Sequence, residues 1–137
     1  MPYQPGLDVH EYLDQALMHM ATNAGFDMAE EADIFGRTFQ FLNEALGRQA
    51  FKRWNGHAFT GKFLMSVFEV LATSASQNVD TLTQMQPQAR NDFIVNAAKG
   101  LWANPVFNAN SGAGIRGTTR LSRLLPLAGQ LLNPNPV

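Results

Sequence analysis

The sequence contains no cysteine, and its longest apolar run is short and interrupted. The lack of cysteine excludes disulfide bonds, thiolate zinc sites and cysteine nucleophiles, and it is typical of a reducing compartment. The run from Phe63 to Ala72 is broken by Ser66 and Glu69 and is too short to cross a bilayer. The first residues, MPYQPGLD, lack the basic and apolar regions of an export signal. We therefore expect a cytoplasmic protein that does not enter a membrane.

Histidine is also scarce, with three residues in 137. His10 and His19 are nine residues apart and His57 is distant, so neither an H-x-x-x-H nor an H-E-x-x-H zinc pattern exists. No stretch alternates between apolar and polar residues with the period of a β-strand. The sequence accordingly predicts no metal site, no cofactor and no catalytic residue, and it gives no indication of a β-sheet.

What the chain does have is enough apolar material for one core. Apolar residues make up 45% of it, including ten phenylalanines and six methionines. A chain of this length fits one domain, because domains cluster at roughly 100 to 150 residues. We expect residues 1–137 to form a single helical domain, with residues 1–6 and 133–137 flexible.

Two capping boxes predict the first two helices. Asp8 is followed at the third position by Glu11, and Asp27 by Glu30, so each pair can satisfy free backbone amides at a helix start. Apolar residues then recur at helical spacing: Val9, Tyr12, Leu13, Ala16, Leu17 and Met20 in the first helix, and Met28, Ala32, Phe35, Phe39, Leu42 and Leu46 in the second. Gly47 ends the second helix. The two helices should form an antiparallel hairpin whose apolar stripes are covered by something else.

The middle of the chain predicts a loop and then a central helix. Residues 48–54 suggest a short helical turn, and residues 55–61 a loop, because Asn-Gly and a second glycine break both periodicities. The helix from Lys62 to about Ser74 is apolar nearly all round, so it should be the most buried element. Thr60 is the expected cap of this helix.

The last part of the chain predicts two further helices. Pro87 suits the first turn of one, which Asn104-Pro105 stops. Residues 103–117 are rich in Asn, Gly and Ala, and Thr118 or Thr119 can cap a helix ending at Leu125. The predicted fold class is all-α, an irregular bundle of about five helices with a glycine-rich loop and a short C-terminal helix.

One segment resembles a nucleotide-binding loop and fails in detail. Residues 56–62, GHAFTGK, match G-x-x-x-x-G-K, but Phe63 stands where magnesium binding needs Ser or Thr. The preceding AFKRW is too short and too cationic for the buried strand that a P-loop follows. We interpret the segment as a helix start with Lys62 in solvent.

Residues 112–117 spell G-x-G-x-x-G, the dinucleotide fingerprint, without the strand before it or the acid after it. A glycine-rich turn that enters a helix nevertheless offers free backbone N–H groups to an anion. Three arginines follow at positions i, i+4 and i+7, on one helix face, where they could bind phosphate or pair with the acidic first helices. The candidate contacts to an anion or nucleic acid are Arg116, Arg120, Arg123, Thr118, Lys52 and Arg53.

Glu69 is the one carboxylate within the apolar helix, and its burial would demand a cation. Lys62, Arg53 and Arg90 are the candidate partners. We favour a structural ion pair over a general base, because no histidine, serine or metal cluster accompanies Glu69.

Charge is unevenly divided along the chain. Residues 1–45 hold eight acids and one base, a net charge near −7, whereas residues 46–137 hold nine bases and three acids, near +6. The favoured interpretation is that the acidic helices dock against the basic remainder, within one domain or across a dimer. The alternative is a basic face left free for nucleic acid.

The segment FKRWNGHAFTGKFLMSVFEVL, the later WANPVF and the run SGAGIRGTTRLSRLLPLA carry a family resemblance. Residues 48–132 resemble the helical C-terminal part of the ParB-like, GmrSD-type family, domain-of-unknown-function family 262. Full members resemble nucleotide-dependent restriction proteins of phage defence and carry an N-terminal Asp-Gly-Gln-Gln-Arg motif, which this chain lacks. The resemblance implies an accessory or truncated member, and no active-site residue carries over.

The sequence favours a noncatalytic helical domain that binds a protein partner or associates with itself. The alternative is a nucleic-acid or phosphate-binding module that uses the basic C-terminal segment.

Overall fold

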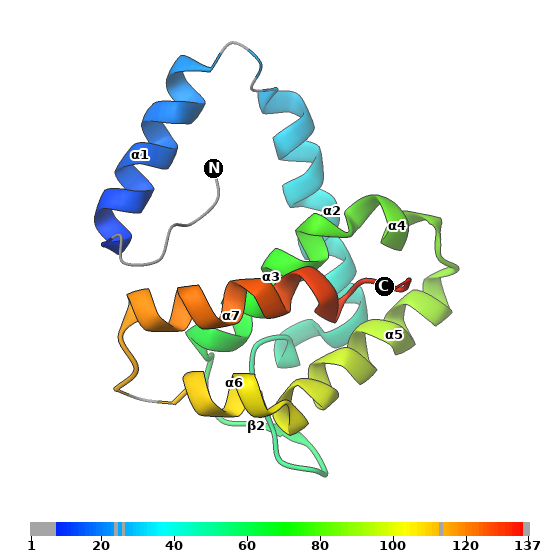
Figure 1. Cartoon of the computed structure of the whole chain (residues 1–137). Helices are drawn as coiled ribbons and strands as arrows, with labels where there is room; N and C mark the ends of the chain where they lie inside the picture. The colour runs from blue at the N-terminus through cyan, green and yellow to red at the C-terminus, as the bar shows by residue number, and fades with distance from the viewer. Residues whose placement is uncertain (1–7, 24, 26, 113, 136–137) are drawn as a thin grey trace.

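The computed structural model describes residues 8–23, 25, 27–112 and 114–135, and within them it is almost entirely helical (Figure 1). The elements in chain order are α1 (Val9–Thr22), α2 (Met28–Leu46), the 3₁₀ helix η1 (Gly47–Gln49), β1 (Arg53–Trp54), β2 (Phe59–Thr60), α3 (Met65–Gln77), α4 (Val79–Gln84), α5 (Pro87–Gly100), the 3₁₀ helix η2 (Leu101–Ala103), α6 (Pro105–Asn110) and α7 (Gly117–Leu131). The all-α class is confirmed, with seven α-helices in the described residues where about five were expected. None of the described helices is both long and apolar enough to cross a membrane. Of the ends expected to be flexible, residues 1–6 and 136–137 lie outside the described residues, whereas residues 133–135 lie within them.

The first two helices begin where their capping boxes predict. The Asp8 carboxylate accepts hydrogen bonds from the backbone N–H groups of His10 and Glu11, and Asp27 accepts one from Glu30. Gly47 ends α2 with φ 55° and ψ −128°, a backbone conformation that residues other than glycine rarely adopt. Local chemistry therefore determines both ends of this part of the chain.

α3 is the central helix, as its composition predicts, but it begins three residues later than expected. Seven of its residues are buried, including Val67, Val70 and Leu71. The expected cap is wrong: Thr60 pairs with Arg53 in a two-stranded hairpin, and Leu64 precedes the first turn without a side-chain cap. Alternation of apolar and polar residues does not indicate this hairpin, because each strand has only two residues.

Two short helices and a longer last helix also depart from expectation. α4 follows α3 almost directly, and α6 occupies part of the region predicted as a loop. Asn104 accepts hydrogen bonds from the N–H groups of Val106 and Phe107, so it starts α6 in the same place where it ends the preceding turn. α7 continues past Leu125 and through Pro126 to Leu131.

The core forms where α3 crosses α7, the most extensive contact between two helices of the described structure (Figure 1). The C-terminal half of α2, with α5 and α6, completes the body around this pair. Ser74 of α3 accepts a 2.8 Å hydrogen bond from the backbone N–H of Leu132, which fixes the end of α7. The largest fully buried apolar side chains are Leu42, Val67, Val70, Leu71, Leu82, Ile94, Leu101, Phe107, Leu124 and Leu132.

α1 and the first half of α2 extend from this body as an arm, here meaning the described residues between 8 and 35, of which Ile34 still packs against the core (Figure 1). No extensive contact joins α1 to any other described element. The second half of α2, from Thr38 onward, contributes to the core through Phe41, Leu42 and Leu46. One continuous helix therefore carries both the exposed arm and part of the buried core.

Candidate functional site

The arginine face predicted on α7 is partly occupied by an ion pair. Arg120 donates two hydrogen bonds to the Glu69 carboxylate, from Nε at 2.7 Å and from Nη2 at 2.8 Å. The two side chains are 23% and 15% exposed, so much of the pair is shielded from water. The hydrogen bond to Glu69 raises the pKa of Arg120 above its ordinary value, although partial burial opposes the shift. The partner of Glu69 is thus none of Lys62, Arg53 and Arg90, because α7 rather than the hairpin or α5 lies beside this part of α3.

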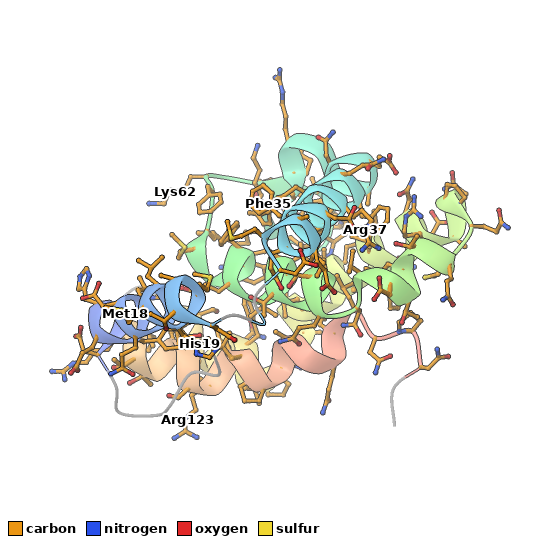
Figure 2. The ribbon with its side chains drawn as sticks, turned by 90° about the horizontal axis from the view of Figure 1, so that it is seen from above. Met18, His19, Phe35, Arg37, Lys62 and Arg123 are labelled. Atoms are coloured by element: carbon orange, nitrogen blue, oxygen red, sulfur yellow. The ribbon has the colours of Figure 1, made fainter. Side chains whose placement is uncertain are left out.

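The rest of the predicted anion site does not converge. Arg116 precedes the first residue of α7 and is exposed, and Figure 2 shows Arg123 projecting away from the same helix. Thr118 lies in the first turn, where its backbone carbonyl accepts a hydrogen bond from the Ser122 hydroxyl. Lys52 and Arg53 belong to the hairpin region. Helical spacing put three arginines near one face, but Arg120 turns inward to α3.

Two more arginines are bound to carboxylates. Arg90 is buried and donates to Glu44 at 3.2 Å, with its guanidinium carbon 4.0 Å from the centre of the Phe41 ring. Arg37 bridges Asp33 and Asp80, at 2.7 and 3.1 Å, and its pKa is raised chiefly by the hydrogen bond to Asp80 and then by that to Asp33.

None of the carboxylates on α1 or in the first turn of α2 forms an ion pair within the described residues. The expected docking of the acidic helices onto the basic part of the same chain is therefore wrong for the arm.

The two motifs that resemble nucleotide sites form no such site. Residues 56–62 cover the hairpin turn and β2 instead of a loop between a strand and a helix, and Lys62 projects from the surface (Figure 2). Gly112 and Gly114 lie between α6 and α7, Gly117 is the first residue of α7, and residue 113 is outside the described residues. In the part of the chain that the structure describes, no three His, Asp or Glu side chains are placed to hold a metal ion.

The hairpin brings together aromatic and cationic side chains that the sequence did not associate. Asn55 accepts hydrogen bonds from the N–H groups of His57 and Ala58, both at 2.8 Å, and Gly56 has φ 98°, so the turn is locally determined. Trp54 pairs with Phe59 across the strands, and their ring centres are 5.0 Å apart. This turn holds the Trp54 ring against α5.

A cation lies over each tryptophan. The Lys99 ammonium is 4.5 Å from the centre of the Trp54 ring, and the guanidinium carbon of Arg53 is 5.1 Å from the centre of the Trp102 ring. Both distances are within the range of favourable cation–π interactions. Neither Arg53 nor Lys99 forms an ion pair with a carboxylate of the described residues. We call these two cations and two tryptophans the tryptophan face.

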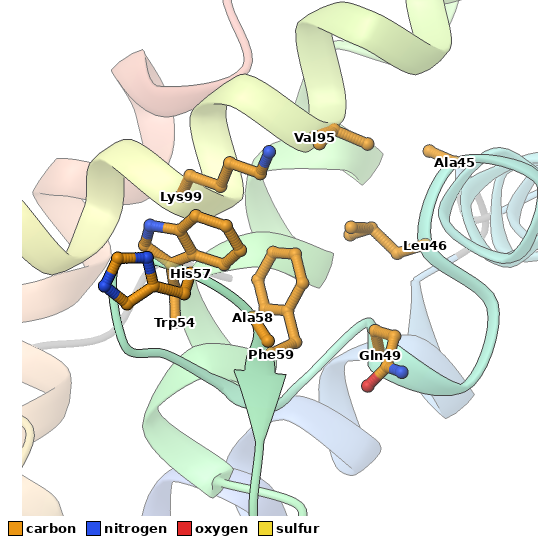
Figure 3. Close-up of a pocket in the computed structure, with 9 residues that line it drawn as sticks. All are labelled: Ala45, Leu46, Gln49, Trp54, His57, Ala58, Phe59, Val95 and Lys99. Atoms are coloured by element: carbon orange, nitrogen blue, oxygen red, sulfur yellow. The ribbon is translucent and has the colours of Figure 1, made fainter.

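Two hollows share Trp54 and Lys99. The first, of about 350 Å³, is bounded by Phe59, Leu46 and Val95, and Figure 3 shows Lys99 and His57 on either side of Trp54 at its edge. The second, of about 360 Å³, is bounded by Arg53, Trp102, Asn55 and Asn108. Among the described residues, no carboxylate lines either hollow.

A second surface feature is a row of phenylalanines that starts on the arm. Adjacent ring centres are 4.7 to 6.2 Å apart along the series Phe35, Phe39, Phe68 and then Phe51 and Phe63. We call these five residues the phenylalanine strip. Phe35 and Phe63, at its two ends, are 66% and 52% exposed. Beside Phe35, a hollow of about 450 Å³ opens between α1, α2 and α3.

Comparisons of the chain with protein-family models, with curated proteins and with solved structures found no match.

Sequence reasoning missed the tryptophan face and had only weak signals for it. Arg53 is predicted as an anion contact, whereas Trp54, Lys99 and Trp102 are not predicted as binding residues. The Asn55-Gly56 turn between two aromatic residues is a signal for a hairpin that could have been used. The approach of Trp102 to the hairpin is a tertiary contact, which no local pattern indicates.

Proposed function

We propose that the chain is a noncatalytic self-association domain whose partner is a second copy of itself. The arm carries the proposal, because Leu13, Leu17, Met20, Met28 and Phe35 lie exposed on it. Several large apolar side chains exposed on one segment are typical of an interaction site. Helical hairpins with one apolar stripe ordinarily bury that stripe against other helices.

Charge favours a second copy of this chain as the occupant. The arm bears carboxylates that have no cationic partner in the described residues. The far end of the phenylalanine strip lies among cations, since Arg48 and Lys52 line a hollow with Phe51 and Phe63, and Lys62 adjoins Phe63 in the chain. An acidic apolar arm and a basic aromatic strip are complementary in both charge and polarity.

A symmetric dimer would use both surfaces twice. In a two-fold arrangement the same pair of patches is used by each copy, so α1 of each chain would cover the phenylalanine strip of the other. This exchange would cover both arms and leave no uncovered surface to which a third copy could bind. It also gives the uneven charge of the sequence a role between molecules.

Light scattering after size exclusion, on the whole chain, tests the proposal. The unmodified chain should run as a dimer at micromolar concentration, and Leu17→Glu should run as a monomer, because it places a charge in the buried stripe. Met18→Glu is the matched control: Leu17 and Met18 are 61% and 65% exposed, but Met18 lies about 100° further round the helix, away from Leu13 and Met20.

A charge reversal tests the complementarity separately. Lys62→Glu should weaken the dimer, and raising the salt concentration should weaken it less in this variant than in the unmodified chain, because a screened attraction has been removed. An unmodified chain that stays monomeric, or a Met18→Glu variant that dissociates as readily as Leu17→Glu, would refute the proposal. The accessory or truncated role implied by the family resemblance stays a prediction.

A further inference from the structure

The cations of the described chain fall into two groups. Arg37, Arg90 and Arg120 are bound to carboxylates, whereas the others form no ion pair within the described residues. Most of this second group gathers on residues 48–62 and at the end of α5, and residues 45–68 contain no acid at all. Positive charge left without counter-charge in one region favours an anionic ligand.

At the tryptophan face, this charge lies beside the two tryptophan rings. Trp54 and Trp102 are half-buried, so each ring is held by packing while part of it remains accessible. Arg53 and Lys99 are already placed over the two rings. The chain therefore presents two flat apolar surfaces and two cations without a carboxylate partner within one pair of adjoining hollows.

We propose that the tryptophan face binds single-stranded nucleic acid, with bases stacked on Trp54 and Trp102 and phosphates held by Arg53 and Lys99. Lysine carries its charge on a flexible four-carbon stem, so Lys99 can leave the Trp54 ring to a base and move to the adjoining phosphate. The Arg53 guanidinium can bind a phosphate through two hydrogen bonds. Stacking and phosphate contact together are the usual means of binding a strand without reading its sequence.

The geometry favours an unpaired strand over a duplex or an acidic protein segment. The rings line hollows beside the hairpin and α5, and an unpaired base can stack on them, whereas a base inside a duplex already has both faces covered by its neighbours. An acidic peptide could form ion pairs with the two cations, but it has no flat ring that could stack on the tryptophans. This site is separate from the phenylalanine strip and does not depend on self-association.

Fluorescence anisotropy with labelled oligonucleotides of about 12 residues tests the proposal, with oligo-dT and oligo-U as parallel probes. Both strands should bind at low salt, because neither contact requires the 2′-hydroxyl, and a tighter complex with one of them would identify the sugar preferred. Two phosphate contacts predict that the logarithm of the affinity falls with the logarithm of salt concentration at a slope of about −1.4. Binding should also quench the tryptophan fluorescence.

Substitutions distinguish this site from the basic C-terminal segment. Arg53→Gln with Lys99→Gln removes both charges and keeps both rings, and it should lower affinity at least tenfold. Trp54→Ala should lower it at least about fivefold, the smallest effect expected for one stacked base. The matched control is Arg116→Ala with Arg123→Ala, which removes two exposed cations elsewhere and should leave affinity within twofold. Circular dichroism checks that each variant is folded. If Trp54→Ala is not folded, the variant with Arg53→Gln and Lys99→Gln alone tests the proposal.

The Leu17→Glu variant separates the two proposals, because it should bind the strand like the unmodified chain even if it no longer dimerises. The nucleic-acid proposal is overturned by an absence of binding at low salt. It is equally overturned if the Arg116→Ala, Arg123→Ala control loses as much affinity as the variant with Arg53→Gln and Lys99→Gln. Displacement of the strand by polyglutamate at an equal concentration of charge, or equal affinity for a duplex, would also overturn it, since neither ligand can stack on the rings.

Discussion

Removing Arg120 should destabilise the fold, because it leaves Glu69 shielded from water without its cation. Removal of one partner from a fully buried pair costs about 3 to 5 kcal/mol, whereas exposed pairs contribute about 0.2 to 1 kcal/mol. Glu69 and Arg120 are 15% and 23% exposed and share two short hydrogen bonds, which places them nearer the buried limit. We therefore expect Arg120→Ala to lower the free energy of unfolding by about 2 to 3 kcal/mol.

Urea unfolding, followed by circular dichroism and tryptophan fluorescence, measures this loss at one fixed protein concentration, since association would otherwise shift the midpoint. Arg123→Ala is the control, because Arg123 lies on the same helix, is exposed and has no carboxylate partner in the described residues. It should change stability by less than about 0.5 kcal/mol. Replacing both Glu69 and Arg120 by leucine should cost less than Arg120→Ala alone, because no charge remains unpaired. Equal effects of Arg120→Ala and Arg123→Ala would refute the reasoning.

Two further predictions concern packing and backbone conformation. Phe107→Ala should lower the free energy of unfolding by about 3 to 5 kcal/mol, because the ring is fully buried. Val106→Ala, at a residue that is 47% exposed, should lower it by less than about 1 kcal/mol. Similar losses for the two variants in urea unfolding would contradict the burial of α6 against α7. Gly36→Ala should stabilise the chain by about 0.5 to 1 kcal/mol, since the added Cβ would meet no atom within 4 Å in the helix. Gly47→Ala should destabilise it by about 1 kcal/mol or more, because residue 47 has φ 55°. Thermal unfolding gives the sign of each change, and two changes of the same sign would refute the different backbone roles given to the two glycines.

The features that the sequence predicted correctly depend on neighbouring residues. Asp8 and Asp27 cap helices because their side chains reach N–H groups two or three residues away. Gly47 ends α2 for an equally local reason. The predicted burial of α3 follows from its composition, but its first residue does not, since the pairing of Arg53 with Thr60 removes the expected cap.

Proline was the least reliable signal. Asn104-Pro105 was correctly interpreted as a helix end, but Pro105 also suits the first turn of a new helix, so α6 begins at once. Pro126 lies within α7 although proline removes a helical hydrogen bond. The burial of Leu124, Ala128 and Leu132 against the rest of the core outweighs that loss.

The candidate sites were harder to predict than the fold, because both depend on contacts between distant segments. Helical spacing predicts that Arg116, Arg120 and Arg123 share one face, and the last two do lie on α7, but the direction of Arg120 is determined by Glu69 on another helix. Likewise, Arg53 was named for its charge, and only the folded chain places it over Trp102. Sequence supplies residue types and local faces, whereas the folded chain decides which of them meet.

α2 passes from a solvated arm into the core without a break, so it can unfold in part, from its N-terminal end, while the rest of the helix stays folded. The turns after Thr38 are held by core side chains and open only when the body does, while the earlier turns are held mainly by their own backbone hydrogen bonds. A boundary between helix and coil can therefore move along α2 without disturbing the core. Any surface that covers the arm would shift this boundary toward Asp27 and extend the cooperative unit by several turns.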